Sequence, residues 1–183
     1  MMPTMSFGQA PALAYDIHTT GDANPYYLTE FNGKLYFTAE DGTNGKELWV
    51  YDGTTATMVH DIYSGATGSS IQYLTEYNGK LYFKAEDGIH GYELWEYDGT
   101  NAPTMVHDIR TGSTGSSPAY LAVFNGKLYF RASDGTNGYE LWEYDGTNTP
   151  TKIAGAPYPE ELIVYNGKLY FKADGGYHNN GEE

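Results

Sequence analysis

The sequence predicts an all-β fold, a four-bladed β-propeller, from three observations. The composition is rich in Gly and Tyr, with 23 and 19 copies among 183 residues, which favours strands and tight turns over helices. A heptapeptide recurs four times, as FNGKLYF at 31–37 and 124–130 and as YNGKLYF at 77–83 and 165–171. A second segment recurs three times, as ELWVYDGT at 47–54 and ELWEYDGT at 93–100 and 140–147. Repeats of several short strands at about this spacing are typical of propeller blades.

Each repeat contains four expected strands, a to d. In the second repeat these are QYLTEY, KLYFKAE, YELWEY and TMVHDI, which lie between residues 72 and 109. Strands a and b are separated by Asn-Gly, the sequence that favours a type I′ hairpin turn because both residues tolerate positive φ. Asp-Gly begins the two later turns and favours a reversal of the chain for a related reason. The unit is therefore predicted to be a small antiparallel sheet.

The middle strands carry apolar and aromatic residues on both faces, as KLYF and ELW show. Each sheet must therefore be covered on both sides. Blades packed face to face around an axis meet this requirement. An open solenoid and a single β-sandwich are the competing architectures, but sandwich strands alternate with one polar face, which these strands lack.

The two ends of the chain read as two halves of one blade. Residues 1–17 align with residues 93–109, so that Pro11 matches Pro103 and Ile17 matches Ile109. We expect residues 1–17 to supply strands c and d, and residues 156–183 to supply strands a and b. Pairing of these segments would close the ring and remove exposed strand edges. The prediction is one propeller domain over 1–183, with blades at about 20–62, 63–109, 110–155, and 156–183 completed by 1–17.

Three copies of Glu-Leu-Trp-x-x-Asp-Gly-Thr, each preceded by Asn-Gly-Lys-Leu-Tyr-Phe, resemble the repeats of the bacterial ELWxxDGT family. The similarity covers nearly the whole chain. It implies a propeller-like β architecture, an extracellular or cell-surface location and no established chemistry. The family often has a second Gly-Thr soon after Asp-Gly-Thr, which this chain lacks.

Composition limits the partners. The formal net charge is −14, which repels phosphate backbones, so we expect no nucleic-acid binding. No apolar stretch is long enough to cross a bilayer, and the first residues lack the pattern of a signal peptide. We therefore expect no membrane insertion and leave the localisation and the export route open. The absence of Cys excludes disulfides and thiolate metal sites.

The candidate site lies in the b-to-c and d-to-a loops, which emerge on one face of a propeller and surround its mouth. These loops combine carboxylates, amides, hydroxyls and a His, a mixture that suits the hydroxyl groups of sugars. Tyrosines near the same face add stacking surfaces. The predicted ligand-binding residues are Asp41, Asn44, Asp87, His90, Asp134, Asn137, Tyr26, Tyr73 and Tyr120.

Each candidate also has a structural interpretation. The aspartates precede Gly, so they can simply stabilise turns. Adjacent carboxylates such as Glu40 and Asp41 do not provide the separation that glycoside hydrolysis needs, and we predict no enzyme activity. No cofactor is expected, although the oxygen-rich loop at Asp41 leaves calcium binding open. The repeated Trp49, Trp95 and Trp142 are expected in the blade core, and His60 and His107 are expected to pack rather than to bind metal.

Two functional classes follow from this reading. The first is a non-catalytic, multivalent carbohydrate-binding module similar to a lectin. The second is a structural scaffold that binds another protein or assembles with copies of itself, so that the partner is a glycan, a protein or a homo-oligomer. Binding to glycan-bearing particles that free sugar reverses would distinguish the first class from the second.

Overall fold

The computed structural model describes residues 15–173, and these form fourteen β-strands and no helix. Hydrogen bonding joins them into three four-stranded sheets and one two-stranded sheet, all antiparallel. The first sheet contains β1 (Tyr26–Phe31), β2 (Lys34–Glu40), β3 (Lys46–Tyr51) and β4 (Ala56–His60); the second contains β5 (Gln72–Tyr77), β6 (Lys80–Ala85), β7 (Glu93–Tyr97) and β8 (Thr104–His107); the third contains β9 (Ala119–Phe124), β10 (Lys127–Ala132), β11 (Glu140–Tyr144) and β12 (Thr151–Pro157); the fourth contains β13 (Pro159–Tyr165) and β14 (Lys168–Ala173).

The predicted all-β fold is confirmed for these residues, as is the strand order a-b-c-d within each full sheet. The Asn-Gly hairpins have the predicted turn geometry, since Asn32 and Gly33 have φ angles of 50° and 71°, as a type I′ turn requires. The third sheet extends to Pro157, two residues beyond the boundary expected at 155. Between residues 15 and 173 there is no helix that could cross a membrane.

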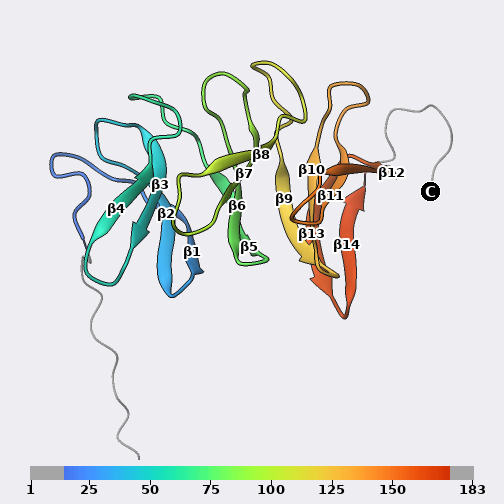
Figure 1. Cartoon of the computed structure of the whole chain (residues 1–183), viewed down its shortest axis with the longest axis horizontal. Coiled ribbons are helices and arrows are strands. Elements are labelled where there is room, and N and C mark those ends of the chain that lie inside the picture. Colours follow the sequence, from blue (N-terminus) through green and yellow to red (C-terminus); the bar gives the residue numbers. More distant parts are fainter. Residues whose placement is uncertain (1–14, 174–183) are drawn as a thin grey trace, which may run out of the picture.

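The four sheets stand side by side along a curved row (Figure 1). Their innermost strands, β1, β5, β9 and β13, are neighbours in chain order. The sheets therefore stack like blades, with strand a nearest to the neighbouring sheets and strand d outermost.

The core lies between the sheets. One cluster joins Phe31, Tyr36 and Leu48 of the first sheet to Phe83 and Trp95 of the second. A second cluster repeats this contact between the second and third sheets. Trp49, Trp95 and Trp142 are all buried, which confirms their predicted place in the core. The expectation that His60 and His107 pack is wrong, because both side chains are exposed: the d strands that carry them end at the outer rim.

The predicted ring closure falls mainly on residues 1–14 and 174–183, which lie outside the described residues. Of the proposed N-terminal strands only the end is described, and there Ile17 packs against Phe37 and Trp49 of the first sheet. This contact matches the repeat register, because the equivalent Ile62 packs in the cluster with Phe83 and Trp95 of the next sheet. The first and last sheets stand at opposite ends of the row (Figure 1).

Candidate functional site

The b-to-c loop of each sheet packs against the d-to-a loop that follows that sheet. Ser69 donates its backbone N–H to the carbonyl of Lys46 at 3.1 Å, and Ser117 donates to Tyr92 at 2.8 Å. The contact is so close that a Cβ on Gly68 would lie 2.2 Å from the backbone nitrogen of Lys46. The two loop types therefore lie at the same end of the sheets, as expected for the mouth of a blade array.

A buried glutamate from the Glu-Leu-Trp motif fixes each pair of loops. Glu47 is fully buried and accepts hydrogen bonds from the Ser69 hydroxyl at 2.5 Å and from the Ser69 backbone N–H at 2.8 Å. It also accepts from the N–H groups of Ile62 and Tyr63. Burial raises the pKa of Glu47 to about 7, against the opposing effect of these donors.

Glu93 makes the same contacts one repeat later, with Ser116, Ile109 and Arg110. Burial also raises its pKa. The glutamate of the motif thus holds the loop that leads into the next sheet. Its role in both copies is structural.

The three predicted aspartates lie in turns. Asp41 Oδ1 accepts the backbone N–H groups of Thr43 and Asn44 at 2.8 and 2.9 Å, and Asp87 does the same for Ile89 and His90. These bonds lower the pKa of Asp41. The turn-stabilising interpretation is therefore confirmed for these two residues, while their role in ligand binding stays a prediction.

Asp134 differs from the other two because Lys152 pairs with its Oδ2 at 3.0 Å. Together with hydrogen bonds from Thr136, this cation lowers the pKa of Asp134 to about 2. The corresponding amide, Asn137, is exposed.

Beside the other two aspartates, the predicted polar residues point into the loop itself. Asn44 Nδ2 donates to Asp41 Oδ2 at 2.9 Å. His90 Nδ1 lies 2.7 Å from Asp87 Oδ2, and this contact raises the pKa of His90. The loops are therefore stiff, with their polar atoms partly engaged internally.

The tyrosines gather on the innermost strands at the mouth. The rings of Tyr73 and Tyr120 have centroids 5.8 Å apart. Tyr27, rather than the predicted Tyr26, occupies the equivalent position, because each of the three residues has a positive φ of 56° to 61° at an irregularity of its strand. Positive φ is unusual for a bulky residue and occurs preferentially at functional sites.

Tyr26 takes part in another contact, with Lys46 Nζ 4.7 Å from its ring centroid. Such cation–π pairs recur in each full sheet: Lys84 lies 4.2 Å from the ring centroid of Tyr92, and Arg131 lies 4.6 Å from that of Tyr139. Each full sheet thus places a basic side chain over a tyrosine ring.

We call Tyr27, Tyr73, Tyr120, Lys84 and Arg131 the axial cluster. Arg131 stacks on Tyr120 at 4.8 Å and pairs with Glu160 at 3.3 Å. Burial and the nearby Arg131 lower the pKa of Lys84, and none of the residues between 15 and 173 forms an ion pair with it. The axial cluster thus brings together two basic side chains, of which Arg131 is paired with Glu160.

Sequence reasoning missed Lys84 and Arg131. The available signal was their repeated position, since KLYFKA and KLYFRA place a basic residue at the same point of strand b. Lys84 and Tyr73 lie on adjacent strands of one sheet, as do Arg131 and Tyr120, whereas the contact between Tyr73 and Tyr120 joins neighbouring sheets and could not be read from one repeat.

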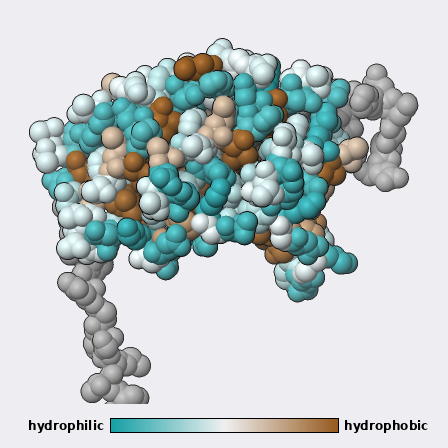
Figure 2. Space-filling model, in the orientation of Figure 1, coloured by the Kyte–Doolittle hydropathy of each residue, from teal (hydrophilic) through white to brown (hydrophobic). Residues whose placement is uncertain are grey.

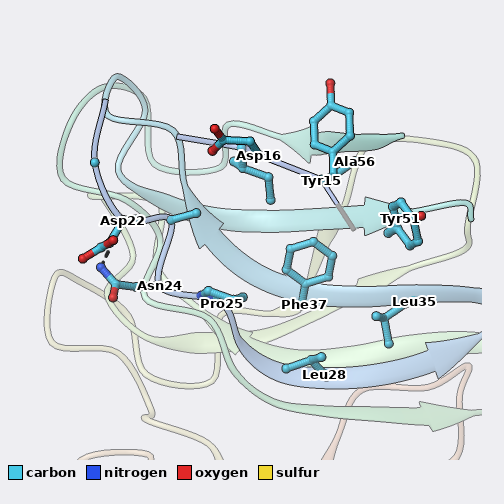
Figure 3. Close-up of a pocket in the computed structure, with 13 residues that line it drawn as sticks. Tyr15, Asp16, Asp22, Asn24, Pro25, Leu28, Leu35, Phe37, Tyr51 and Ala56 are labelled. Atoms are coloured by element: carbon cyan, nitrogen blue, oxygen red, sulfur yellow. Dashed lines mark hydrogen bonds between the residues drawn. The ribbon is translucent and has the colours of Figure 1, made fainter. Parts of the chain in front are cut away.

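Two pockets lie away from the axial cluster. One, of about 580 Å³, lies between the first two sheets and is lined by His60, Tyr63, Asp87 and Trp95 among others. The other, of about 500 Å³, lies between the first sheet and the segment from Tyr15 to Pro25 that precedes it. Figure 3 shows Leu28, Leu35 and Phe37 on the first sheet, with Tyr15 and Asp16 above them in this view.

The described part of the chain holds no group of three acidic or His side chains arranged as metal ligands. Calcium binding at the Asp41 loop therefore gains no support from the geometry. In comparisons with known proteins, no family model and no curated protein sequence matches this chain, so its membership of the ELWxxDGT family stays a prediction that rests on the motif.

Proposed function

We propose that the protein is a non-catalytic carbohydrate-binding module whose ligand site is the mouth formed by the axial cluster and the surrounding loops. The observation that carries this proposal is the position of Tyr120, whose ring contacts both the ring of Tyr73 and the guanidinium of Arg131. Aromatic rings stack against the apolar faces of sugars, while cations and loop hydroxyls bind their oxygens. Lys84 and Arg131 favour a sugar that carries a carboxylate.

The site is proposed to be multivalent because similar groups recur in successive sheets. Each copy of a shallow polar site binds weakly, and several copies together raise avidity when the ligand can span them. The stiff loops at Asp41 and Asp87 support this proposal, since ordered loops lose little entropy on binding.

We also propose the finer architecture, in which the sheets are blades of a propeller around one axis. The neighbouring order of β1, β5, β9 and β13 supports it. A ring of four blades closed within one chain stays the prediction of the sequence.

The test is a glycan-array screen of neutral and acidic sugars with and without calcium, followed by measurement of affinity on an immobilised glycan. Replacing Tyr120 by Ala removes one ring of the stacked pair. An aromatic contact contributes about 0.5–1.5 kcal/mol, so we expect affinity to fall roughly two- to tenfold per site, and further when avidity multiplies the loss.

Lys34→Ala is the matched control, because Lys34 is exposed and follows an Asn-Gly turn at the opposite end of the sheet. It should bind like the parent protein. Loss of binding in the Lys34 variant, with the Tyr120 variant unchanged, would place the ligand on the opposite face and reject the proposed site.

The second candidate function is a self-assembling scaffold. A specific observation favours it: the outer faces of the first and last sheets expose apolar residues such as Leu28 and Tyr170.

A further inference from the structure

The contacts between sheets inside the chain follow one rule. Tyr36 of β2 meets Tyr97 of β7 in the next sheet, with ring centroids 5.9 Å apart. One repeat later, Tyr82 of β6 meets Tyr144 of β11, also at 5.9 Å. Each contact thus joins the b-strand tyrosine of one sheet to the c-strand tyrosine of the following sheet.

These contacts bury both sides. Tyr36 and Tyr82 are only 2 % and 1 % exposed, and Tyr97 and Tyr144 are also buried. In the sheet that follows at each contact, Leu81 or Leu128 is fully buried under the preceding sheet. We call the side with the b-strand tyrosine the Tyr face of a sheet, and the opposite side, which carries the Phe of Lys-Leu-Tyr-Phe, the Phe face.

Within residues 15–173, no other sheet packs on the Tyr face of the last sheet. Register places Ile163 opposite Tyr170, with Tyr165 on the same side. Tyr165 and Tyr170 form the same aromatic pair as Tyr77 and Tyr82 do, at 6.5 Å rather than 5.7 Å. Unlike Tyr82, Tyr170 is 47 % exposed.

Among residues 15–173 no other sheet covers the Phe face of the first sheet. Ile17 and Ala23 pack against part of this face, and the rest of it lines the pocket of about 500 Å³ (Figure 3). Leu35 and Tyr51 occupy the positions of the buried Leu81 and Tyr97 but are only partly buried. Leu28, whose counterpart Leu74 packs between sheets, is 61 % exposed. The two end faces are therefore chemically the two halves of the internal interface.

We infer that the Tyr face of the last sheet packs on the Phe face of the first sheet of a second copy of this chain, joining the copies head to tail. The internal interfaces supply the geometry, so that Tyr170 of one copy meets Tyr51 of the other. A second copy is the occupant because the two faces of one copy stand at opposite ends of the row (Figure 1). A contact of this heterologous type either closes into a ring or continues as a chain.

Ring closure with two copies is compatible with known propellers. Each copy contributes four sheets, so two copies contribute eight, and propellers have about four to eight blades. Figure 2 shows that one side of the row is mostly hydrophilic, with small separate hydrophobic patches.

The test uses the absence of native cysteine. Tyr51→Cys and Tyr170→Cys are prepared as separate single variants, mixed, and treated with a short bis-maleimide linker. We expect a covalent species of two chains in the mixture, and little of it with either variant alone. The double variant Tyr36→Cys with Tyr97→Cys sets the reference, because its linker forms within one chain across an internal interface.

Sedimentation gives an independent readout. The parent chain should have the mass of two or more copies, and Tyr170→Glu should weaken association by roughly a hundredfold or more, because it buries an unpaired charge. Ile89→Glu places the same charge at another exposed apolar residue and should associate like the parent. Unchanged circular dichroism of both variants excludes unfolding as the cause.

Two results would overturn the inference. One is a parent chain that sediments as a single copy at all concentrations. The other is a double variant, Tyr51→Cys with Tyr170→Cys, that links only within one chain, which would show closure in the manner that the sequence predicts. The inference does not depend on glycan binding, so the failure of either proposal leaves the other intact.

Discussion

At the scale of single residues, the repeated glutamate has the clearest physical role. Glu47 and Glu93 are fully buried and accept hydrogen bonds from backbone groups of the following loop. A repeated carboxylate beside Leu-Trp could suggest catalysis. In this protein, however, it accepts hydrogen bonds from backbone N–H groups of the loop that follows the sheet. Buried backbone N–H groups need such partners.

This role predicts an unusual pH dependence. The pKa of Glu47 is raised to about 7 and that of Glu93 is raised as well. The folded protein therefore holds protons that the unfolded chain releases, and stability falls as pH rises from about 4.5 to about 7. Below about pH 4 the sign reverses, because the pKa values of Asp41 and Asp87 are lowered. Calorimetric melting temperatures should peak at about pH 4 to 4.5 and fall toward pH 7.

The double variant Glu47→Gln with Glu93→Gln should lower the melting temperature at pH 5 and largely remove the decline toward pH 7. Glu140→Gln is the matched control, since Glu140 occupies the same repeat position but lies beside Lys152 at 2.8 Å. The melting temperature of the Glu140→Gln variant should still fall toward pH 7. A parent protein that is more stable at pH 7.5 than at pH 5 would contradict this account.

At the scale of elements, glycine decides how closely the loops approach one another. Gly115 has a φ of 66°, and a Cβ there would lie 2.3 Å from the backbone nitrogen of Tyr92. The neighbouring Gly112 has a φ of 95° with nothing within 4 Å of a Cβ. Both glycines lie in one loop with positive φ, but only Gly115 is closely packed. Comparing them therefore separates the effect of backbone conformation from the effect of packing.

We predict that Gly115→Ala lowers the free energy of unfolding by more than about 2 kcal/mol, since it adds a backbone clash to a left-handed conformation that costs about 1–2 kcal/mol. Gly112→Ala should lower the free energy of unfolding only by the cost of the left-handed conformation, because it adds no clash. Urea denaturation of the two variants measures the difference. Equal losses would mean that the contact between the loops does not constrain the fold.

At the scale of the whole molecule, stability comes from the contacts between sheets. Leu81 is fully buried beneath the first sheet, whereas the equivalent Leu35 lines the free pocket. Within residues 15–173, the same residue at the same repeat position is covered by a neighbouring sheet in the second sheet, whereas in the first sheet it packs only within the cluster of Phe37 and Trp49.

Leu81→Ala should therefore reduce the free energy of unfolding by about 3–5 kcal/mol. In dilute solution, Leu35→Ala should reduce the free energy of unfolding by less than roughly half as much as Leu81→Ala, because no neighbouring sheet covers Leu35. If copies associate head to tail, the cost of Leu35→Ala should rise with protein concentration while that of Leu81→Ala does not. Thermal denaturation at two concentrations tests both statements, and equal costs in dilute solution would show that the Phe face of the first sheet is already covered.

The sequence by itself determined the local architecture. The recurrence of Asn-Gly specified the hairpins because both residues accept positive φ, and the two-sided apolar pattern of Lys-Leu-Tyr-Phe required sheets that are covered on both faces. The register of the N-terminal segment was also readable, since Ile17 packs on Phe37 and Trp49 as its repeat position predicts. These features depend on short-range geometry, which each repeat contains in full.

Only the tertiary structure decided the composition of the candidate site. Asp41 and Asp87 had both a binding and a turn-stabilising interpretation from the sequence, and the structure shows that their Oδ1 atoms accept backbone N–H groups two and three residues later in the chain. The contacts that Tyr120 makes with Tyr73 and with Arg131 join three strands of two sheets. The contact between Tyr73 and Tyr120 depends on how neighbouring sheets pack against each other, which no single repeat encodes. For the same reason, only the structure shows that no other sheet among residues 15–173 covers the Phe face of the first sheet or the Tyr face of the last.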